Sequence, residues 1–350
     1  MVYADYAATY PYVKYPSSDY GTFFNPNANY AYKEKRLLSE AENRVKKAIG
    51  AKGGKVVFGG TSSQLIENLM NVILSSQYGC DVFCSQYEHD SFFRYRDDSF
   101  YNKDELELLL NQIDNYTIPV VLWQAVQNLT GEIFPTKQIG GLVHKYNGFY
   151  ICDGTAQIGH TLIEPNIDDW CDFYAFSGHK LGTELGIGCC WVSDRLDRWL
   201  DGVKLHGTPN LAGALAMTQA VEDSCNISLL EERQAQWVDL SDELYSRLLD
   251  VCADVKQIGN NEGCWAINAI RLPGFNARAL QSYLASKEVY IGLGQSSCAD
   301  KADRRILCQG YGLSEQEADE VVRISFGENS NVDEVKALID GIVTFRKEYL

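Results

Sequence analysis

The chain has 350 residues, of which 45% are hydrophobic and 22% are charged, which is the composition of a globular protein with ample material for a core. Its 31 Lys and Arg residues against 47 Asp and Glu residues give a formal net charge of −16 at pH 7. So acidic a chain repels nucleic acid and anionic membranes, and we expect neither as a partner. The length allows one large domain, or a large domain and a small one.

The cysteines and the N-terminal residues indicate the cellular compartment in which the protein is expected. The eleven cysteines are scattered between Cys80 and Cys308, without a CxxC pair and without a Cys/His cluster at zinc-binding spacing. We therefore expect buried, reduced thiols and no metal site. The first residues lack both the basic and the apolar region of a signal peptide, and no apolar stretch is long enough to cross a bilayer. Together these features predict a cytoplasmic protein.

Short apolar runs alternate with amphipathic stretches through the first two-thirds of the chain. Six of these runs have the length and composition of buried strands. They are Lys55–Phe58, Asp81–Cys84, Pro119–Trp123, Phe149–Cys152, Asp172–Phe176 and Gly186–Val192. Helical patterns lie among them, for example at Ala41–Ile49 and Lys137–Tyr146. Alternation of this kind favours an α/β domain with a mostly parallel sheet, in which functional groups gather at the carboxyl ends of the strands.

The last third of the chain is a long helical stretch followed by short alternating elements. These are the helical stretch Leu211–Leu249, an apolar run at Trp265–Leu272, and helices at Ala277–Ala285 and Val332–Arg346. We interpret this part as a smaller α+β domain. The predicted large domain covers residues 15–235, and the predicted small domain covers residues 1–14 and 236–350.

The tetrapeptide Ser177-Gly178-His179-Lys180 directly follows a predicted strand. A lysine at a strand end is well placed to form a Schiff base with an aldehyde cofactor, and the neighbouring serine and histidine can hydrogen-bond a phosphate. Asp153 follows the strand Phe149–Cys152, where a buried carboxylate would need a cationic partner such as a protonated pyridine nitrogen. On these residues alone, a surface lysine and a turn-capping aspartate explain the pattern as well.

Three further positions carry polar side chains that suit a cofactor or a substrate. His89 follows the strand Asp81–Cys84, where its imidazole could stack on a flat ring or could be an ordinary core histidine. The turn Thr61-Ser62-Ser63 enters a helix after two glycines, which suits a bound anion but also a simple N-cap. Arg323 lies in the otherwise apolar run VVRISFG, and its guanidinium needs a carboxylate from a substrate or from the protein itself.

The order of these residues resembles that of the class V aminotransferase superfamily of fold-type I pyridoxal-phosphate enzymes, and most of all the cysteine desulfurases. The opening Tyr3–Pro11 (YADYAATYP) is similar to the family's Y-L-D-x-A-A-T-T-P, and FSGHK is nearly its lysine motif. Gly207-Thr208-Pro209-Asn210 is similar to its G-T segment. The resemblance runs nearly end to end. It implies a large domain with a mostly parallel seven-stranded sheet and a smaller α+β C-terminal domain.

The resemblance also implies a role for each candidate residue. Lys180 would hold pyridoxal 5′-phosphate (PLP) as a Schiff base, Asp153 would pair with the ring nitrogen, and His89 would stack on the ring and shuttle a proton. The remaining contacts that it implies are Ser62, Ser63, Ser177 and His179 at the phosphate, Asn128 at the ring hydroxyl or the substrate, Arg323 at the substrate carboxylate, and Thr208 at the phosphate of a second subunit. The last contact predicts a homodimer with shared active sites.

Two positions decide how closely the chain follows the desulfurases. Gln295-Ser296-Ser297-Cys298 is similar to the family's G-S-A-C, whose cysteine takes the sulfur, and a loop thiolate there could attack a substrate thiol. A chance alignment of one among eleven cysteines is the alternative. The family's glutamine after the pyridinium aspartate is Ala156 here, and Gln157 comes one position late. Either Gln157 reaches the cofactor through a local shift, or that contact is lost.

The sequence therefore predicts a PLP-dependent cysteine desulfurase that converts L-cysteine to L-alanine with a persulfide on Cys298. The sulfur would pass to an acceptor protein for iron–sulfur clusters or thio-modification. Two alternatives stay open. Another class V enzyme, such as a carbon–sulfur lyase, a selenocysteine lyase or a small-substrate aminotransferase, would make Cys298 incidental. A catalytically retired scaffold paralogue is the other alternative, although the intact Lys180 argues against it.

Overall fold

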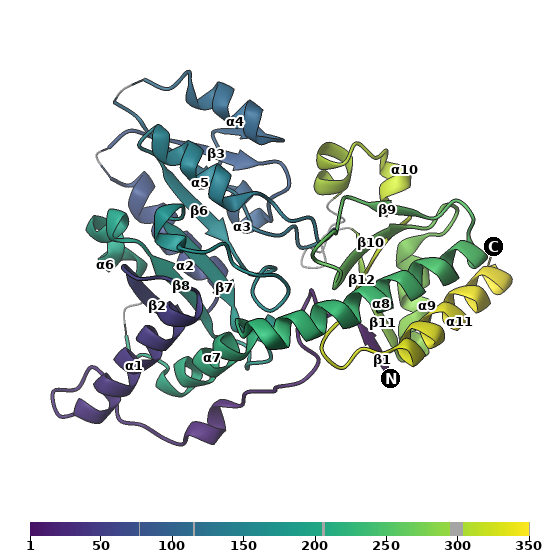
Figure 1. The fold of residues 1–350 in the computed structure, drawn as a ribbon, viewed down its shortest axis with the longest axis horizontal. Helices are drawn as coiled ribbons and strands as arrows, with labels where there is room; N and C mark the ends of the chain where they lie inside the picture. The colour runs from purple at the N-terminus through teal and green to yellow at the C-terminus, as the bar shows by residue number, and fades with distance from the viewer. Residues whose placement is uncertain (77, 115, 205–206, 295–303, 350) are drawn as a thin grey trace. The chain divides into compact units, whose positions relative to one another are not determined.

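The computed structural model describes residues 1–76, 78–114, 116–204, 207–294 and 304–349. The chain forms two compact units (Figure 1), a large unit of residues 12–125 and 134–227 and a small unit of residues 1–11, 126–133 and 228–350. This division differs from the expected one, which ended the large domain at 235 and kept 126–133 within it. The large unit ends at residue 227, at the start of helix α8 (Ile227–Val251), and not at 235. The helix belongs to the small unit because it packs against other elements of that unit; for example, Trp237 donates a hydrogen bond to the carbonyl of Gly327 at 3.1 Å.

A seven-stranded sheet forms the centre of the large unit. Its spatial order is β2 (Lys55–Gly59), β8 (Gly188–Val192), β7 (Phe173–Ser177), β6 (Phe149–Asp153), β5 (Ile118–Leu122), β3 (Cys80–Ser85) and β4 (Asp98–Phe100). The pairs from β7 through β4 are parallel, and β8 runs antiparallel to both of its neighbours. The predicted α/β fold with a mostly parallel sheet of seven strands is confirmed.

The six predicted strands agree with β2, β3, β5, β6, β7 and β8 to within two residues at each end. Strand β4 was not expected, because three residues without an apolar run give no recognisable pattern. Alternate strand residues enter two separate apolar cores, so that Val120 and Leu122 face one core and Val121 faces the other. Both faces of the sheet are therefore covered, as a parallel sheet requires.

Helices of the large unit flank this sheet (Figure 1). They are α1 (Tyr32–Ala48), α2 (Ser62–Leu74), α3 (Asp90–Phe93), α4 (Lys103–Leu110), α5 (Thr136–Lys145), α6 (Leu200–Val203) and α7 (Leu211–Ser224). The expected helix at 41–49 begins nine residues earlier than its apolar pattern indicated, at Tyr32. The long helical stretch expected from Leu211 is two helices, α7 and α8, separated at Cys225 and Asn226.

The small unit contains a five-stranded sheet, in agreement with the expected α+β composition. Its order is β1 (Val2–Ala4), β11 (Val289–Leu293), β12 (Val321–Ser325), β10 (Ile267–Arg271) and β9 (Lys256–Ile258). Its helices besides α8 are α9 (Ala277–Ser286), α10 (Glu315–Ala318) and α11 (Val332–Tyr349). Strand β1 is parallel to β11, whereas the other pairs are antiparallel. The opening residues thus form the edge of a sheet built mainly from the end of the chain.

The ten cysteines in the described ranges are all free thiols, and seven of them are buried. Cys189 and Cys190 lie in β8 without solvent exposure, and burial raises the pKa of each thiol. They behave as small apolar side chains.

Within the described ranges, no helix is long and apolar enough to span a membrane.

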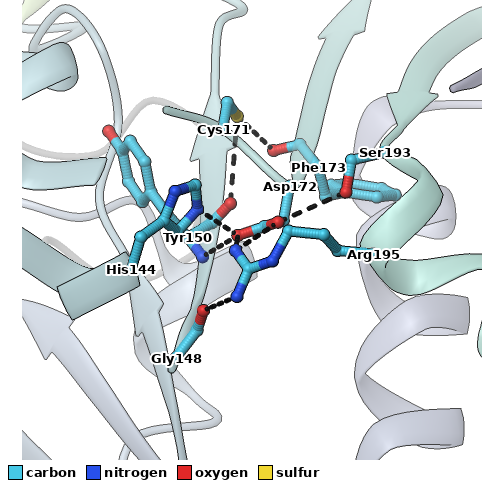
Figure 2. Close-up of polar contacts among 8 residues, drawn as sticks. All are labelled: His144, Gly148, Tyr150, Cys171, Asp172, Phe173, Ser193 and Arg195. Atoms are coloured by element: carbon cyan, nitrogen blue, oxygen red, sulfur yellow. Dashed lines mark hydrogen bonds and ion pairs between the residues drawn. The ribbon is translucent and has the colours of Figure 1, made fainter. Parts of the chain in front are cut away.

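A buried aspartate ties together the edge of the large sheet where β6 and β7 begin (Figure 2). Asp172 directly precedes β7 and has no solvent exposure. Its carboxylate accepts hydrogen bonds from Arg195 at 2.8 and 3.0 Å, from His144 Nε2 at 2.9 Å and from the backbone N–H of Tyr150 at 2.9 Å. Ser193 adds a hydroxyl bond of 3.2 Å. The four donors satisfy both carboxylate oxygens, so this charge is compensated inside the protein.

Replacement of this carboxylate should destabilise the fold. Asp172→Ala leaves Arg195, His144 and a buried N–H without their acceptor, and we expect a loss of about 3 kcal/mol in the free energy of unfolding, measured by urea denaturation. Asp201→Ala is the matched control, because Asp201 is exposed and forms a surface ion pair with Lys204 at 2.9 Å. It should leave the free energy of unfolding nearly unchanged, because solvent screens an exposed ion pair. Equal losses in the two variants would contradict the assigned role of Asp172.

Candidate active site

Two neighbouring strands of the large sheet carry the principal candidates at the same edge. Asp153 is the last residue of β6, and Ser177 is the last residue of β7. The two strands are parallel, with Asp153 in register with Ala175. Lys180 ends the single helical turn Gly178–Lys180 that follows β7. The structure therefore brings Asp153 and the lysine turn to the carboxyl edge of the sheet, where α/β folds bind their ligands.

The start of helix α2 meets this edge at the end of β7. The Oγ atoms of Ser62 and Ser177 lie 2.6 Å apart, and both side chains are buried. Gly188 makes this approach possible, because a Cβ there would lie 2.5 Å from the carbonyl carbon of Thr61 and 2.6 Å from the nitrogen of Ser62. Ser63, the next residue, is exposed. Two hydroxyls and the N-terminus of a thirteen-residue helix form a set of donors that suits a phosphate.

Asp153 keeps part of its carboxylate available. Oδ1 accepts a hydrogen bond from the N–H of Thr155 at 2.9 Å, and this is the one side-chain hydrogen bond of Asp153 within the described ranges. The Thr155 hydroxyl is buried without a partner among these residues. A half-buried carboxylate with an unoccupied oxygen fits a cationic ring nitrogen. The residues present thus fit PLP at both its phosphate and its ring nitrogen.

Gln157 is bound inside the large unit. Its Oε1 accepts a hydrogen bond from Tyr174 at 2.7 Å, and its Nε2 donates to the carbonyl of Leu162 at 3.1 Å. The Tyr174 ring packs against Gly154, where a Cβ would lie 2.0 Å from a ring carbon. Both ends of the amide are used, which favours loss of the cofactor contact over a local shift. We therefore leave Gln157 out of the proposed cofactor site.

His179 and His89 flank the candidate site with different environments. Burial, followed by the positive charge of Lys180, lowers the pKa of His179 to about 4. His179 is therefore neutral at pH 7 and can donate an N–H to a phosphate. His89 directly precedes α3, and its Nδ1 accepts a hydrogen bond from the N–H of Ser91 at 3.2 Å. Its half-exposed ring follows β3 at the same edge of the sheet.

Arg323 is a buried cation of the small unit, and it already has a protein partner. Its Nη2 donates to the carboxylate of Asp5 at 2.6 Å, and its Nη1 donates to the carbonyl of Asn128 at 3.2 Å. Its Nε is buried without a partner among the described residues. The guanidinium lies against Gly292, where a Cβ would be 2.9 Å from Nε and 2.6 Å from an Asp5 oxygen. Arg323 thus keeps unused N–H groups, and Asp5, which sequence reasoning did not single out, holds it in place.

The two remaining candidates differ in what the structure says of them. Thr208 lies in the segment before α7 and is exposed. Cys298, together with Gln295, Ser296 and Ser297, lies outside the described residues.

The lowered pKa of His179 predicts a pH dependence of stability. Its pKa is 6.5 in an ordinary setting and about 4 in the folded protein, so the unfolded chain binds more protons between these values. Stability should therefore fall as the pH drops from 6.5 towards 4. His179→Gln should flatten this part of the profile, which thermal denaturation between pH 4 and 7 would measure. An unchanged slope in the variant would mean that other groups cause the acid sensitivity.

Comparison with known proteins gives the family of the chain. The sequence pattern of the family described as aminotransferase class-V matches residues 11–338. A probable cysteine desulfurase of Chlamydia muridarum is 25% identical over 95% of this chain and 90% of its own length. A probable mitochondrial cysteine desulfurase of Dictyostelium discoideum is 24% identical over 93% of this chain and 76% of its own length. These similarities extend over nearly the whole chain.

Solved structures show the same fold. A NifS-like protein of Rickettsia africae superposes with a TM-score of 0.82 at 19% identity over 99% of both chains. A cysteine desulfurase of Thermococcus onnurineus gives a TM-score of 0.78 at 20% identity over 99% of this chain and 94% of its own. Class V aminotransferases depend on PLP, in agreement with the cofactor predicted from Lys180 and Asp153. With its fold, its lysine turn and a match from residue 11 to residue 338, the chain belongs to the class-V aminotransferase family of PLP-dependent enzymes.

Proposed function

We propose that the chain is a cysteine desulfurase, which takes sulfur from L-cysteine, releases L-alanine and carries the sulfur as a persulfide on Cys298. The observation that carries the proposal is the position of Lys180 and Asp153 at the ends of adjacent parallel strands. The similarity to relatives named cysteine desulfurases over nearly the whole chain supports the choice of reaction within the family.

The large unit supplies the groups that bind the cofactor and move the α-proton. Lys180 holds the cofactor and, once its amine is free, takes the α-proton of the substrate as general base. Asp153 keeps the ring nitrogen protonated. The donors at the phosphate are Ser62, Ser63, Ser177, His179 and the N-terminus of α2. PLP, when bound, supplies an electron-withdrawing ring that stabilises the negative charge left at the α-carbon.

The small unit supplies the group that recognises an amino acid. Arg323 binds the substrate carboxylate through the N–H groups that its two protein contacts leave unused, and Asp5 holds the guanidinium on its strand. Asn128, whose carbonyl accepts one of these hydrogen bonds, lies beside Arg323 and contacts the substrate or the ring hydroxyl. An α-carboxylate is thus the part of L-cysteine that this unit selects.

Cys298 carries out the sulfur step. Its thiolate attacks the sulfur of the substrate, so that an S–S bond forms and the carbon–sulfur bond breaks. The electron pair of the broken bond stays with the β-carbon, which takes up a proton and becomes the methyl group of alanine. An acceptor protein then removes the terminal sulfur for iron–sulfur clusters or thio-modification and restores the Cys298 thiol.

A homodimer in the cytoplasm is the proposed setting. Thr208 is exposed on its own chain, and Asn27 donates a hydrogen bond to the neighbouring Gly207 carbonyl at 2.8 Å. Phe24 and Tyr30, close to Asn27, are 66% and 71% exposed. An exposed aromatic segment beside Thr208 favours a second subunit, to whose phosphate Thr208 would extend. The free cysteines of the described residues support a reducing compartment.

Cys298→Ala tests the sulfur step directly. Alanine formation from L-cysteine should fall by at least about 100-fold, because the thiolate that accepts the sulfur is missing, while the cofactor absorbance stays. Mass spectrometry of the wild type after L-cysteine should show one added sulfur on Cys298. Undiminished alanine formation would contradict the persulfide role, and pyruvate with free sulfide would identify a carbon–sulfur lyase instead.

Gly292→Ala tests the role of Arg323. The new Cβ would lie 2.6 Å from Asp5 and 2.9 Å from the guanidinium, so the pair must move. We expect the KM for L-cysteine to rise about tenfold with unchanged cofactor absorbance. Gly141→Ala is the control, because a Cβ there meets no atom within 4 Å. A normal KM in Gly292→Ala would argue that Arg323 does not bind the substrate carboxylate.

A further inference from the structure

His89 is fixed through one of its two ring nitrogens. Nδ1 accepts a hydrogen bond from the backbone N–H of Ser91 at 3.2 Å, and the Oγ of Ser91 lies 3.0 Å from the same atom. Nε2 has no hydrogen-bond partner in the part of the chain that the structure describes. Because a backbone N–H can only donate, Nδ1 must carry the lone pair. The neutral imidazole therefore has its proton on Nε2.

The loop that carries His89 is anchored on both sides of the ring. Glu88 is fully buried, and its Oε1 accepts a hydrogen bond from the N–H of Gln124 at 2.7 Å. The side chain of Gln124 in turn donates to the carbonyl of Tyr87 at 2.6 Å. Gln124 follows β5 and Glu88 follows β3, which are adjacent parallel strands. His89 thus cannot turn its Nδ1 outward without losing the contact with Ser91 that begins α3.

We propose that the backbone N–H of Ser91, at the start of α3, holds His89 in its Nε2–H form, so that His89 acts as a hydrogen-bond donor and not as the general base of the reaction. The inference rests on the proposed function and on the expectation, taken from the family resemblance, that His89 stacks on the cofactor ring. A ring in this form has no lone pair at Nε2 with which to accept a proton. Were it to give up the Nε2 proton, it would become an anionic imidazolate. Abstraction of the α-proton and of the substrate thiol proton therefore falls to Lys180, and the expected proton shuttle through His89 is replaced by N–H donation.

Two substitutions of His89 separate a donor from a base. Glutamine can donate an N–H but cannot act as a base at neutral pH, whereas alanine can do neither. With holoenzyme and saturating L-cysteine, we expect kcat of His89→Gln to exceed that of His89→Ala about tenfold, since a hydrogen bond to a charged group is restored. Equal loss of activity in both variants, with the cofactor still bound, would overturn the proposal.

The role of Ser91 has its own test, which does not depend on turnover. In histidine-¹⁵N-labelled holoenzyme, with the His89 signals identified by their absence in His89→Gln, Nδ1 should show the shift of an unprotonated nitrogen and Nε2 that of a protonated one. Ser91→Ala, which removes the hydroxyl but keeps the backbone N–H that bonds to Nδ1, should leave both nitrogen shifts unchanged.

A protonated Nδ1 in the wild type would overturn the proposal, and so would a Ser91→Ala variant in which Nδ1 becomes protonated. If the wild type forms no alanine from L-cysteine, the proposed function fails, and the nitrogen shifts still decide whether Ser91 holds the ring in the Nε2–H form.

Discussion

The parallel pairing of β6 and β7 is the constraint on which the candidate site depends. Parallel neighbours end at the same edge of a sheet, so Asp153 and the turn that carries Lys180 emerge side by side, although Lys180 comes 27 positions after Asp153 in the sequence. The opposite edge of the same strands is fixed by Asp172, whose carboxylate binds donors from α5, β6 and the segment after β8 (Figure 2). The amino edge of these strands is thus held by a compensated buried charge, whereas the carboxyl edge carries the candidate functional groups.

A chain with a net charge of −16 can hold an anionic cofactor only through local donors. The candidate phosphate site uses hydroxyls, a helix N-terminus and a histidine that burial keeps neutral, and it does not depend on a cluster of basic side chains. The charge of Arg323, in contrast, is compensated by groups of the protein itself. Its guanidinium is buried, and Asp5 and the Asn128 carbonyl compensate most of the cost of burying it. A glycine makes close packing possible in each case: Gly188 of β8 lies against the start of α2, and Gly292 lies against the guanidinium.

The surroundings of Asp153 depend on local packing within the large unit. The glycine that follows Asp153 admits the Tyr174 ring, and Tyr174 in turn binds the late Gln157 inside the unit. Ala156 is left at the position where the family has its glutamine. The packing of Tyr174 against Gly154 and the two hydrogen bonds of Gln157 therefore belong to one local arrangement beside Asp153. Beyond β3 at the same edge, the N–H of Ser91 and the buried Glu88 hold His89 and its loop through hydrogen bonds.

The sequence by itself determined the fold class, six of the seven strands of the large sheet and the positions of Lys180, Asp153 and His89 at strand ends, because apolar periodicity and strand-end polarity are local signals. It did not reveal β4, the break between α7 and α8, or the partners of the key side chains. Asp5 binds Arg323, which is 318 positions away in the sequence. From the sequence, Asp172 was expected only as the first residue of a strand, and the fold shows that it accepts hydrogen bonds from several distant donors. Such pairings depend on which strands become neighbours, and only the tertiary structure decided that.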